Sequence, residues 1–254
     1  MLKVAIITAY DKGSASYILA KMPKSQSFEI THIIKAGAIH QSLIKKLSRK
    51  LKKIIKIGPL GAWAGYKMRD WYKLENLKSI ELLAEEKGIN YLEFNSLSDK
   101  KLSKLLSNTD LAISLGNGYI PKKVYESPKF GMINLHHEVL PDYQNAQPII
   151  WQIYNGSVKT GYTIHKINQG IDQGEILKVV DNIDIRFAQS LEETVRHTLP
   201  DVYNASALGL ADVLNNFLTI EPKKQPLGAH YTTPSWKSYK QMQKHCLQWC
   251  QSNK

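Results

Sequence analysis

The chain has few cysteines and no long apolar run. Among 254 residues the two cysteines are Cys246 and Cys250, four positions apart. Two thiols do not form the disulfide framework of a small secreted domain, so we expect a reducing, cytoplasmic setting. No stretch of 18 or more apolar residues occurs, which argues against a membrane-spanning helix. The N-terminus lacks a small-residue cleavage site, and we expect it to form a buried strand rather than a signal peptide.

Negative charge is scarce relative to positive charge. The chain carries 34 lysines and arginines against 22 aspartates and glutamates, a net charge of +12. This excess predicts an anionic partner or surface, and nucleotide diphosphates, tRNA and anionic lipid all qualify. The length suits one large α/β domain with an appendage.

Strand and helix patterns alternate along the first two thirds of the chain. Such alternation predicts an α/β fold with a mostly parallel sheet and helices on both faces. The expected strands are 3–8, 28–34, 91–94, 111–115 and 131–136, and the expected helices are 15–22, 77–87 and 98–106. A strand-like segment at 175–185 follows, then a helical pattern at 191–217 with a kink or break at Pro200, and a final helix from about residue 237.

Residues 41–75 differ from their surroundings. Apolar residues at positions 43, 44, 47, 51, 54 and 55 alternate with lysines and arginine, which predicts an amphipathic helix with a very basic face. The simplest interpretation is a surface helix with a solvated basic face. Two alternatives are peripheral attachment of residues 42–56 to an anionic membrane or a lipid-linked substrate, and contact with nucleic acid.

Three polar side chains between Gly131 and Leu177 are suited to acyl transfer. Asn134 and His136 lie two positions apart on an apolar strand, so both project from one face at its end, where open α/β sheets bind ligands. Asp172 follows 38 positions after Asn134, in a turn. Asn134 can donate to an oxyanion, His136 can donate or move a proton, and Asp172 can hold the imidazole or take a proton through water. Which of the two first accepts a proton from an attacking amine stays open.

Each of these residues also has a structural interpretation when taken alone, because Asn, His and Asp commonly serve as turn, cap or hydrogen-bonding residues. A metal site is not expected, since strand alternation points His137 away from His136 and no matching ligand set follows.

Fixed residues at fixed spacing surround this trio. They are Asn134-Leu135-His136, Leu140-Pro141-Asp142-Tyr143, Thr160-Gly161-Tyr162-Thr163-Ile164-His165 and Asp172-Gln173-Gly174. Over about 60 residues the chain resembles the folate-dependent formyltransferases, which include glycinamide ribonucleotide, methionyl-tRNA and sugar N-formyltransferases. The resemblance implies a Rossmann-like formyltransferase core over residues 1–185, with the basic insertion at about 41–75. A short C-terminal helical appendage would then occupy residues 186–254.

The resemblance also implies a cosubstrate, 10-formyltetrahydrofolate, and no metal. The cofactor-binding positions that it implies are Leu115, Gly116, Asn117, Gly118, Tyr119, Ile120, Val139, Leu140, Pro141, Ile167, Asn168 and Gly170. Three positions depart from the family pattern: Glu138 replaces a small hydroxyl residue, Asn145 replaces a glycine, and Asp142 replaces a residue that is frequently basic. Asn tolerates positive φ better than most residues, so the backbone at 145 can survive the change.

Further residues bear on the acceptor. A turn containing Lys12, Gly13 and Ser14 can cradle a phosphate at a helix N-terminus, and Tyr143 and Asn145 are the other expected substrate-binding residues. A sugar N-formyltransferase fits best, acting on a nucleotide-linked amino sugar or other small amine for surface polysaccharide. Only 74 residues follow Val180, so an RNA-binding domain and a nucleic-acid partner are not expected.

The alternatives are a glycinamide ribonucleotide or methionyl-tRNA formyltransferase, and a noncatalytic folate- or nucleotide-binding protein. A homodimer is left open. The expected location is the cytoplasm, with peripheral contact to the inner face of the membrane through residues 42–56 as a further hypothesis.

Overall fold

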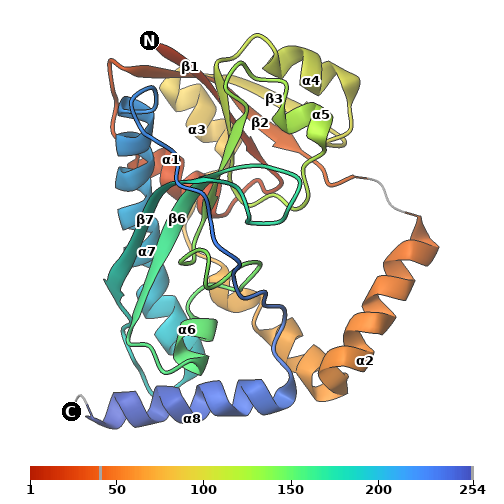
Figure 1. Ribbon diagram of the computed structural model, residues 1–254, viewed down its shortest axis with the longest axis vertical. Coiled ribbons are helices and arrows are strands. Elements are labelled where there is room, and N and C mark those ends of the chain that lie inside the picture. The colour runs from red at the N-terminus through yellow and green to blue at the C-terminus, as the bar shows by residue number, and fades with distance from the viewer. Residues whose placement is uncertain (40–41, 253–254) are drawn as a thin grey trace.

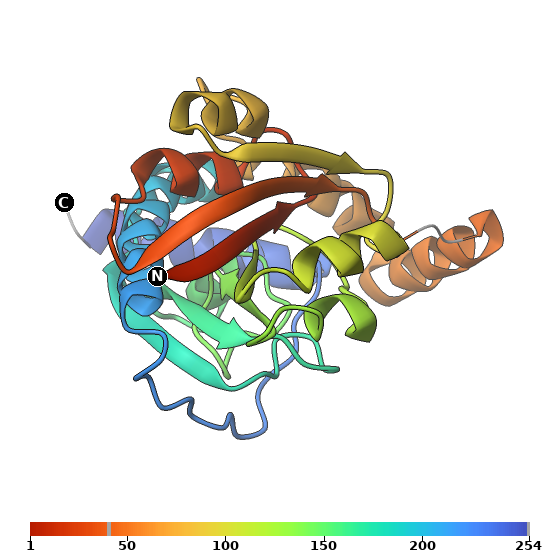
Figure 2. The ribbon, with the colours of Figure 1, turned by 90° about the horizontal axis from the view of Figure 1, so that it is seen from above.

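A seven-stranded sheet forms the centre of the molecule (Figures 1 and 2). The computed structural model describes residues 1–39 and 42–252. In chain order the strands are β1 (Leu2–Thr8), β2 (Phe28–Ala36), β3 (Asn90–Phe94), β4 (Leu111–Ser114), β5 (Met132–His136), β6 (Lys159–Lys166) and β7 (Ile176–Asp184). Their order across the sheet is β3-β2-β1-β4-β5-β6-β7. The five strands from β3 to β5 are mutually parallel, and β6 and β7 are antiparallel additions, so the mostly parallel sheet is confirmed.

Helices cover both faces of this sheet. They are α1 (Ser14–Lys21), α2 (Leu43–Lys67), α3 (Ile80–Lys87), α4 (Lys100–Leu106), α5 (Lys122–Tyr125), α6 (Ile150–Tyr154), α7 (Leu191–Asn215) and α8 (Trp236–Ser252), with a 3₁₀ turn η1 (Asp70–Tyr72). Strand alternation in β1 divides the core: Val4 and Ile6 face α1, α3 and α7, whereas Ala5 and Ile7 face α4 and α5. The helix expected at 77–87 begins later, at Ile80, because the Ser79 hydroxyl accepts from the Leu82 N–H and caps it.

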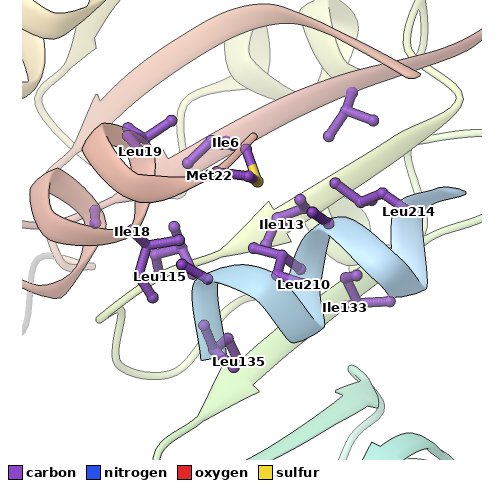
Figure 3. Close-up of a cluster of buried hydrophobic side chains, with 14 of the residues drawn as sticks. Ile6, Ile18, Leu19, Met22, Ile113, Leu115, Ile133, Leu135, Leu210 and Leu214 are labelled. Carbon is purple, nitrogen blue, oxygen red and sulfur yellow. The ribbon is translucent and has the colours of Figure 1, made fainter. Parts of the chain in front are cut away.

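Helix α7 belongs to two cores. Its C-terminal half packs Leu210 and Leu214 against Ile113 and Ile133 of the sheet (Figure 3). Its N-terminal half contributes to a second core with Met242 and other residues of α8. The helix continues through Pro200 without ending. This packing places α7 with the sheet as well as with the C-terminal segment, so the expected boundary at residue 185 does not separate two hydrophobic cores.

The basic segment forms the expected amphipathic helix. The chain bends at Gly58, whose φ of 75° is a left-handed conformation that glycine adopts without steric cost, and Pro59 begins the second half. The first half extends away from the body (Figures 1 and 2), and its apolar residues Leu43, Ile44, Leu47, Leu51 and Ile55 are exposed. Within the part of the chain that the structure describes, no helix is long and apolar enough to cross a membrane.

The second half of α2 packs tightly on the segment that leads into α8. A Cβ added at Gly61 would lie 3.1 Å from the Pro234 carbonyl oxygen, and one added at Gly65 would lie 2.4 Å from the Thr233 methyl carbon. Two glycines one turn apart therefore allow this close approach, and they fix the direction in which the first half projects.

Candidate active site

A cavity of about 380 Å³ lies beyond the ends of β4 and β5. The strand ends supply Ser114, Asn134 and His136, the loop after β4 supplies residues 116–120, and the β6–β7 connection supplies residues 167–172. Carboxyl ends of neighbouring parallel strands open at the same edge of a sheet, and the loops that leave them enclose this space. The three candidate catalytic residues, Asn134, His136 and Asp172, all line it.

The orientation of the Asn134 amide is set by His165 on the adjacent strand. The two residues are cross-strand partners in the β5–β6 pairing. His165 Nδ1 lies 2.8 Å from the Lys166 carbonyl oxygen, which can only accept, so the proton is on Nδ1. In the neutral ring Nε2 is then an acceptor, and Asn134 Nδ2 lies 3.1 Å from it. This bond fixes the amide orientation and leaves the second N–H of Asn134 for another acceptor.

The tautomer of His136 follows from a similar contact. His136 Nε2 lies 3.0 Å from the Tyr143 carbonyl oxygen, so Nε2 is the donor. In the neutral ring Nδ1 is then an acceptor, and it lies 3.9 Å from Asp172 Oδ2. An imidazole held in this way can take up a proton at Nδ1 beside a carboxylate that stabilises the resulting cation.

Asp172 is held in the left-handed region, with φ 54°. Its Oδ2 accepts from the Asn145 N–H at 2.9 Å, and its Oδ1 lies 3.6 Å from His165 Nε2. Burial raises the pKa of the Asp172 carboxyl. At the low pH where this carboxyl titrates, protonated His165 and His136 and the Asn145 N–H outweigh burial and hold that pKa well below its usual range. The carboxyl is therefore ionised at neutral pH.

Burial is also the largest influence on the pKa values of the two neighbouring histidines, His136 and His137. It lowers the pKa of His136, and the charge of Asp172 and the hydrogen bond to Tyr143 only partly offset this effect. His137 also lines the cavity; its ring packs on Tyr203 with centroids 4.5 Å apart, and burial lowers its pKa to about 3. Both imidazoles are therefore neutral at pH 7, and His136 is available to accept a proton.

The segment from Thr160 to His165 holds the loop after β5 in place beside the cavity. The Thr163 hydroxyl donates to the Glu138 carbonyl oxygen at 2.8 Å and accepts from the Leu140 N–H at 3.0 Å. It thereby anchors the loop that follows β5. Gly174 stands where a Cβ would lie 1.6 Å from the Lys166 carbonyl oxygen, so only glycine allows the β6–β7 connection to bring Asp172 this close to β5.

Glu138 is fully buried beside this loop. Its Oε1 accepts from the Ile149 N–H at 2.8 Å, and its Oε2 contacts Gln152 Nε2. Ile149 has a φ of 73°, which is strained for a β-branched residue, so this hydrogen bond supports an unfavourable backbone conformation next to the site. Burial raises the pKa of the Glu138 carboxyl well above its usual value.

The predicted cofactor-binding residues fall into two groups. Gly116, Asn117, Gly118, Tyr119, Ile120, Ile167, Asn168 and Gly170 line the cavity. Leu115, Val139, Leu140 and Pro141 are not among its lining residues, and Leu115 and Leu140 are buried in the protein core.

The cavity wall presents exposed backbone and a buried acceptor that is unpartnered in the part of the chain that the structure describes. Gly116, with φ 74°, exposes backbone in its wall. Asn117 donates from Nδ2 to the Ile7 carbonyl oxygen at 2.7 Å, while its buried Oδ1 has no partner among the described residues. An unpartnered buried acceptor implies a donor from a ligand or water, as the ring edge of a pterin would supply.

The predicted substrate-binding residues lie around the cavity rather than together in it. Asn145 lines it, and its φ of 53° agrees with the tolerance expected of asparagine at this position. Tyr143 contributes its carbonyl to His136, while its ring stacks on Tyr231. Lys12, Gly13 and Ser14 do not line the cavity, although Ser14 lies next to Gly116.

His165 was not among the residues selected from the sequence as site residues, yet it contacts both Asn134 and Asp172. A signal was available: His165 ends the strand pattern of the Thr160–His165 motif. Its partner across the sheet depends on the β5–β6 register, which only the folded chain defines.

The fold and site together define an α/β protein with a Rossmann-like sheet and a polar cavity at the carboxyl ends of its central strands. Residues 67–204, just over half of the chain, match the model of the family described as formyl transferase. The chain therefore belongs to the formyl transferase family.

Several known proteins are similar to this chain. The methionyl-tRNA formyltransferase of Clostridioides difficile (strain 630) is 32% identical over 164 residues, which cover 56% of this chain and 53% of that protein. That of Thermodesulfovibrio yellowstonii is 36% identical over 126 residues, covering 47% and 41%. The chain thus spans about half the length of the curated relatives that it matches.

Solved structures share the fold. Glycinamide ribonucleotide transformylase 1 from Symbiobacterium toebii superposes with a TM-score of 0.56 at 13% identity, covering 89% of this chain and 94% of that chain. An N-formyltransferase from Helicobacter canadensis, solved with folinic acid and dTDP-3-aminofucose, gives 0.54 at 18% identity, covering 97% and 81%. These likenesses confirm the formyltransferase form of the Rossmann-like fold.

Proposed function

We propose that this protein transfers a formyl group from 10-formyltetrahydrofolate to a primary amine. The observation that carries the proposal is the convergence of Asn134, His136 and Asp172 on one cavity, with each orientation fixed by a neighbour. The bound folate would supply the activated formyl group, and loop residues 116–120 and 167–170 would hold it.

The residues of this chain have distinct tasks in such a transfer. Attack by an amine places negative charge on the formyl oxygen, and the second N–H of Asn134 is the donor that stabilises this charge. His136 Nδ1 can receive the proton that the amine must lose and return it to the leaving folate nitrogen, whose bond to the formyl carbon breaks as the new amide forms. Asp172, ionised at neutral pH, stabilises the protonated imidazole and orients the amine. Both routes for the first proton, to His136 or to Asp172, remain consistent with the 3.9 Å separation.

The acceptor that we propose is a nucleotide-linked amino sugar used for surface polysaccharide. The similarity of fold to the Helicobacter canadensis enzyme, solved with dTDP-3-aminofucose, supports this class of acceptor. The methionyl-tRNA formyltransferases supply the second candidate, because they are the curated relatives at 32% to 36% identity.

An acceptor panel tests the proposal. Purified protein would be mixed with 10-formyltetrahydrofolate and, separately, with nucleotide-linked 3- and 4-amino sugars, glycinamide ribonucleotide and charged initiator tRNA. Release of tetrahydrofolate would be followed by absorbance and the formylated product by mass spectrometry. Turnover with an amino sugar is the expected result. Turnover with tRNA alone would overturn the proposal that the acceptor is an amino sugar. Folate binding without turnover on any amine would favour a noncatalytic binding protein.

We further propose that the first half of α2 rests on an anionic membrane. Exposed Leu43, Leu47 and Leu51 form an apolar face, and the lysines beside them complement anionic headgroups. Leu47→Ser with Leu51→Ser should abolish co-sedimentation with vesicles that contain phosphatidylglycerol, whereas Leu208→Ser, a similarly exposed leucine on α7, should not. Equal binding to purely phosphatidylcholine vesicles, or no binding by the wild type, would contradict this proposal.

A further inference from the structure

A second cavity of about 430 Å³ adjoins the candidate active site. It lies between α2, the loop that follows β5 and the segment before α8, and Thr232 and Thr233 form part of its wall. Asn145 lines both this cavity and the first one. The Asn145 N–H donates to Asp172. Asn145 therefore lies between the second cavity and the proposed catalytic carboxylate and contacts both.

The charge of the second cavity is entirely positive. Lys50, Lys53 and Arg69 line it, and among the described residues that line it none is acidic. Partial burial lowers the pKa of the Lys53 ammonium, and the positive charge of Arg69 lowers it further. A bound anion would reduce the electrostatic repulsion between these cations.

Neutral polar groups complete the wall. Gln147 lines the cavity, and its buried Oε1 has no hydrogen-bond partner within the described chain. The Arg69 guanidinium lies over the ring of Tyr66, 5.9 Å from the centroid. A site with cations on one side and an unpartnered amide on another suits a ligand that carries both an anion and a hydrogen-bond donor.

The shape of α2 holds these cations together. Lys50 and Lys53 precede the bend at Gly58, whereas Arg69 follows the end of the helix. The close packing of Gly61 and Gly65 on residues 233–236 fixes the second half of the helix. The bend therefore turns the Lys50 and Lys53 side of the helix toward the same space as Arg69, which a straight helix of this length would not do.

We infer that this second cavity is the anion subsite for the acceptor, and that it binds a phosphate or diphosphate group of a phosphorylated amine. The inference rests on the proposed function. The amine at the other end of that acceptor would then reach Asp172 across Asn145. The phosphate can belong to a water-soluble nucleotide derivative or to a lipid-linked one, because both present the same group to Lys50, Lys53 and Arg69.

A binding experiment with inorganic pyrophosphate tests this subsite without requiring turnover. Isothermal titration calorimetry would compare the wild type with Lys53→Gln, Arg69→Gln and the matched control Lys52→Gln, whose side chain does not line the cavity. Each cavity variant should weaken pyrophosphate binding about tenfold, the usual effect of losing one charge-assisted hydrogen bond. The control should stay within twofold of the wild type. Equal weakening in all three variants, or no binding by the wild type, would overturn the inference.

Turnover provides the second measurement. With an accepted amine, Lys53→Gln and Arg69→Gln should raise KM about tenfold and leave kcat within about twofold, because the lost contact is equal in the ground and transition states. A fall in kcat with unchanged KM would overturn the assignment as a binding subsite. If the variants lose pyrophosphate binding but no amine is formylated, the subsite stands and the proposed function fails.

The source of the phosphate is decided by presenting the acceptor in two forms. One arm uses a soluble nucleotide-diphosphate amino sugar, and the other uses a lipid diphosphate carrying the same amine in phosphatidylcholine vesicles. For whichever acceptor is formylated, KM should be higher in Lys53→Gln and Arg69→Gln than in the wild type. Equal KM values for wild type and variants in that arm would contradict the subsite.

Discussion

Replacing Asp172 with asparagine is expected to lower kcat for formyl transfer about 1000-fold, within the usual range for losing a general acid–base group. Asparagine keeps the shape of the side chain, and its Oδ1 can still accept from the Asn145 N–H. What disappears is the negative charge beside His136 Nδ1 and His165 Nε2. The loss should therefore appear in the chemical step. The free energy of unfolding at neutral pH should also fall, because the folded protein holds the Asp172 pKa below its usual range and the ionised carboxylate thus stabilises the folded state.

The pH dependence distinguishes this role from a structural one. In the wild type, burial lowers the pKa of His136 and the charge of Asp172 partly restores it. Removing that charge should lower the His136 pKa further. The acidic limb of the pH profile of kcat/KM, which reports protonation of His136 in the free enzyme, should then shift to lower pH.

Two comparisons make the result interpretable. Asp142→Asn removes the same charge from an exposed position in the loop that follows β5 and should leave kcat within about twofold. The double variant His136→Ala with Asp172→Asn should be no slower than the slower single variant, because residues that act as one unit are not additive. Independent, multiplicative losses would show that the two side chains do not cooperate.

Replacing Glu138 with glutamine is expected to remove a pH-dependent loss of stability. In the unfolded chain this carboxyl titrates near 4.5, and burial raises its pKa well above that value in the folded protein. Between these two values the folded state binds one proton more than the unfolded state. The contribution of Glu138 to stability is therefore complete below about pH 4.5, and it declines by about 1.4 kcal/mol per pH unit as the pH rises toward the folded-state pKa.

The local hydrogen bonds explain why glutamine should be tolerated. Its oxygen can still accept from the Ile149 N–H. Gln152 Oε1 has no partner within the described residues, and rotation of the Gln152 amide would let it accept from the new amide N–H. Alanine would instead leave the Ile149 N–H and the Gln152 amide without their acceptor in a buried place. We expect Glu138→Ala to cost about 3 kcal/mol.

Urea unfolding at pH 5, 6, 7 and 8 measures both effects. His136 and His137 also have lowered pKa values, and they make stability rise with pH below about 6.5. The informative quantity is therefore the difference in unfolding free energy between wild type and Glu138→Gln, which should grow in favour of glutamine as the pH rises. A difference that is constant with pH would show that Glu138 does not hold the extra proton.

Features that depend on the spacing of residues within one strand or one helix were predictable from the sequence. Alternation within β5 places Asn134 and His136 on one face, and the structure brings both into one cavity with Asp172. The amphipathic helix at 43–56 was also predictable, because its period is visible in the sequence. By contrast, Pro200 predicted a kink or break. There is no break: α7 continues through Pro200, and its two ends pack in separate cores.

The sequence by itself determined the α/β class, the strand that carries Asn134 and His136, and the turn that carries Asp172, because each depends on periodicity or on fixed spacing along the chain. Only the tertiary structure decided the contact of Asn134 with His165, the support of His136 and Asp172 by the loop at Tyr143–Asn145, and the grouping of Lys50, Lys53 and Arg69. Each of these depends on strand register, on a bend at one glycine or on the packing of distant segments. Such relations are set by the free energy of the whole core, which no local pattern encodes.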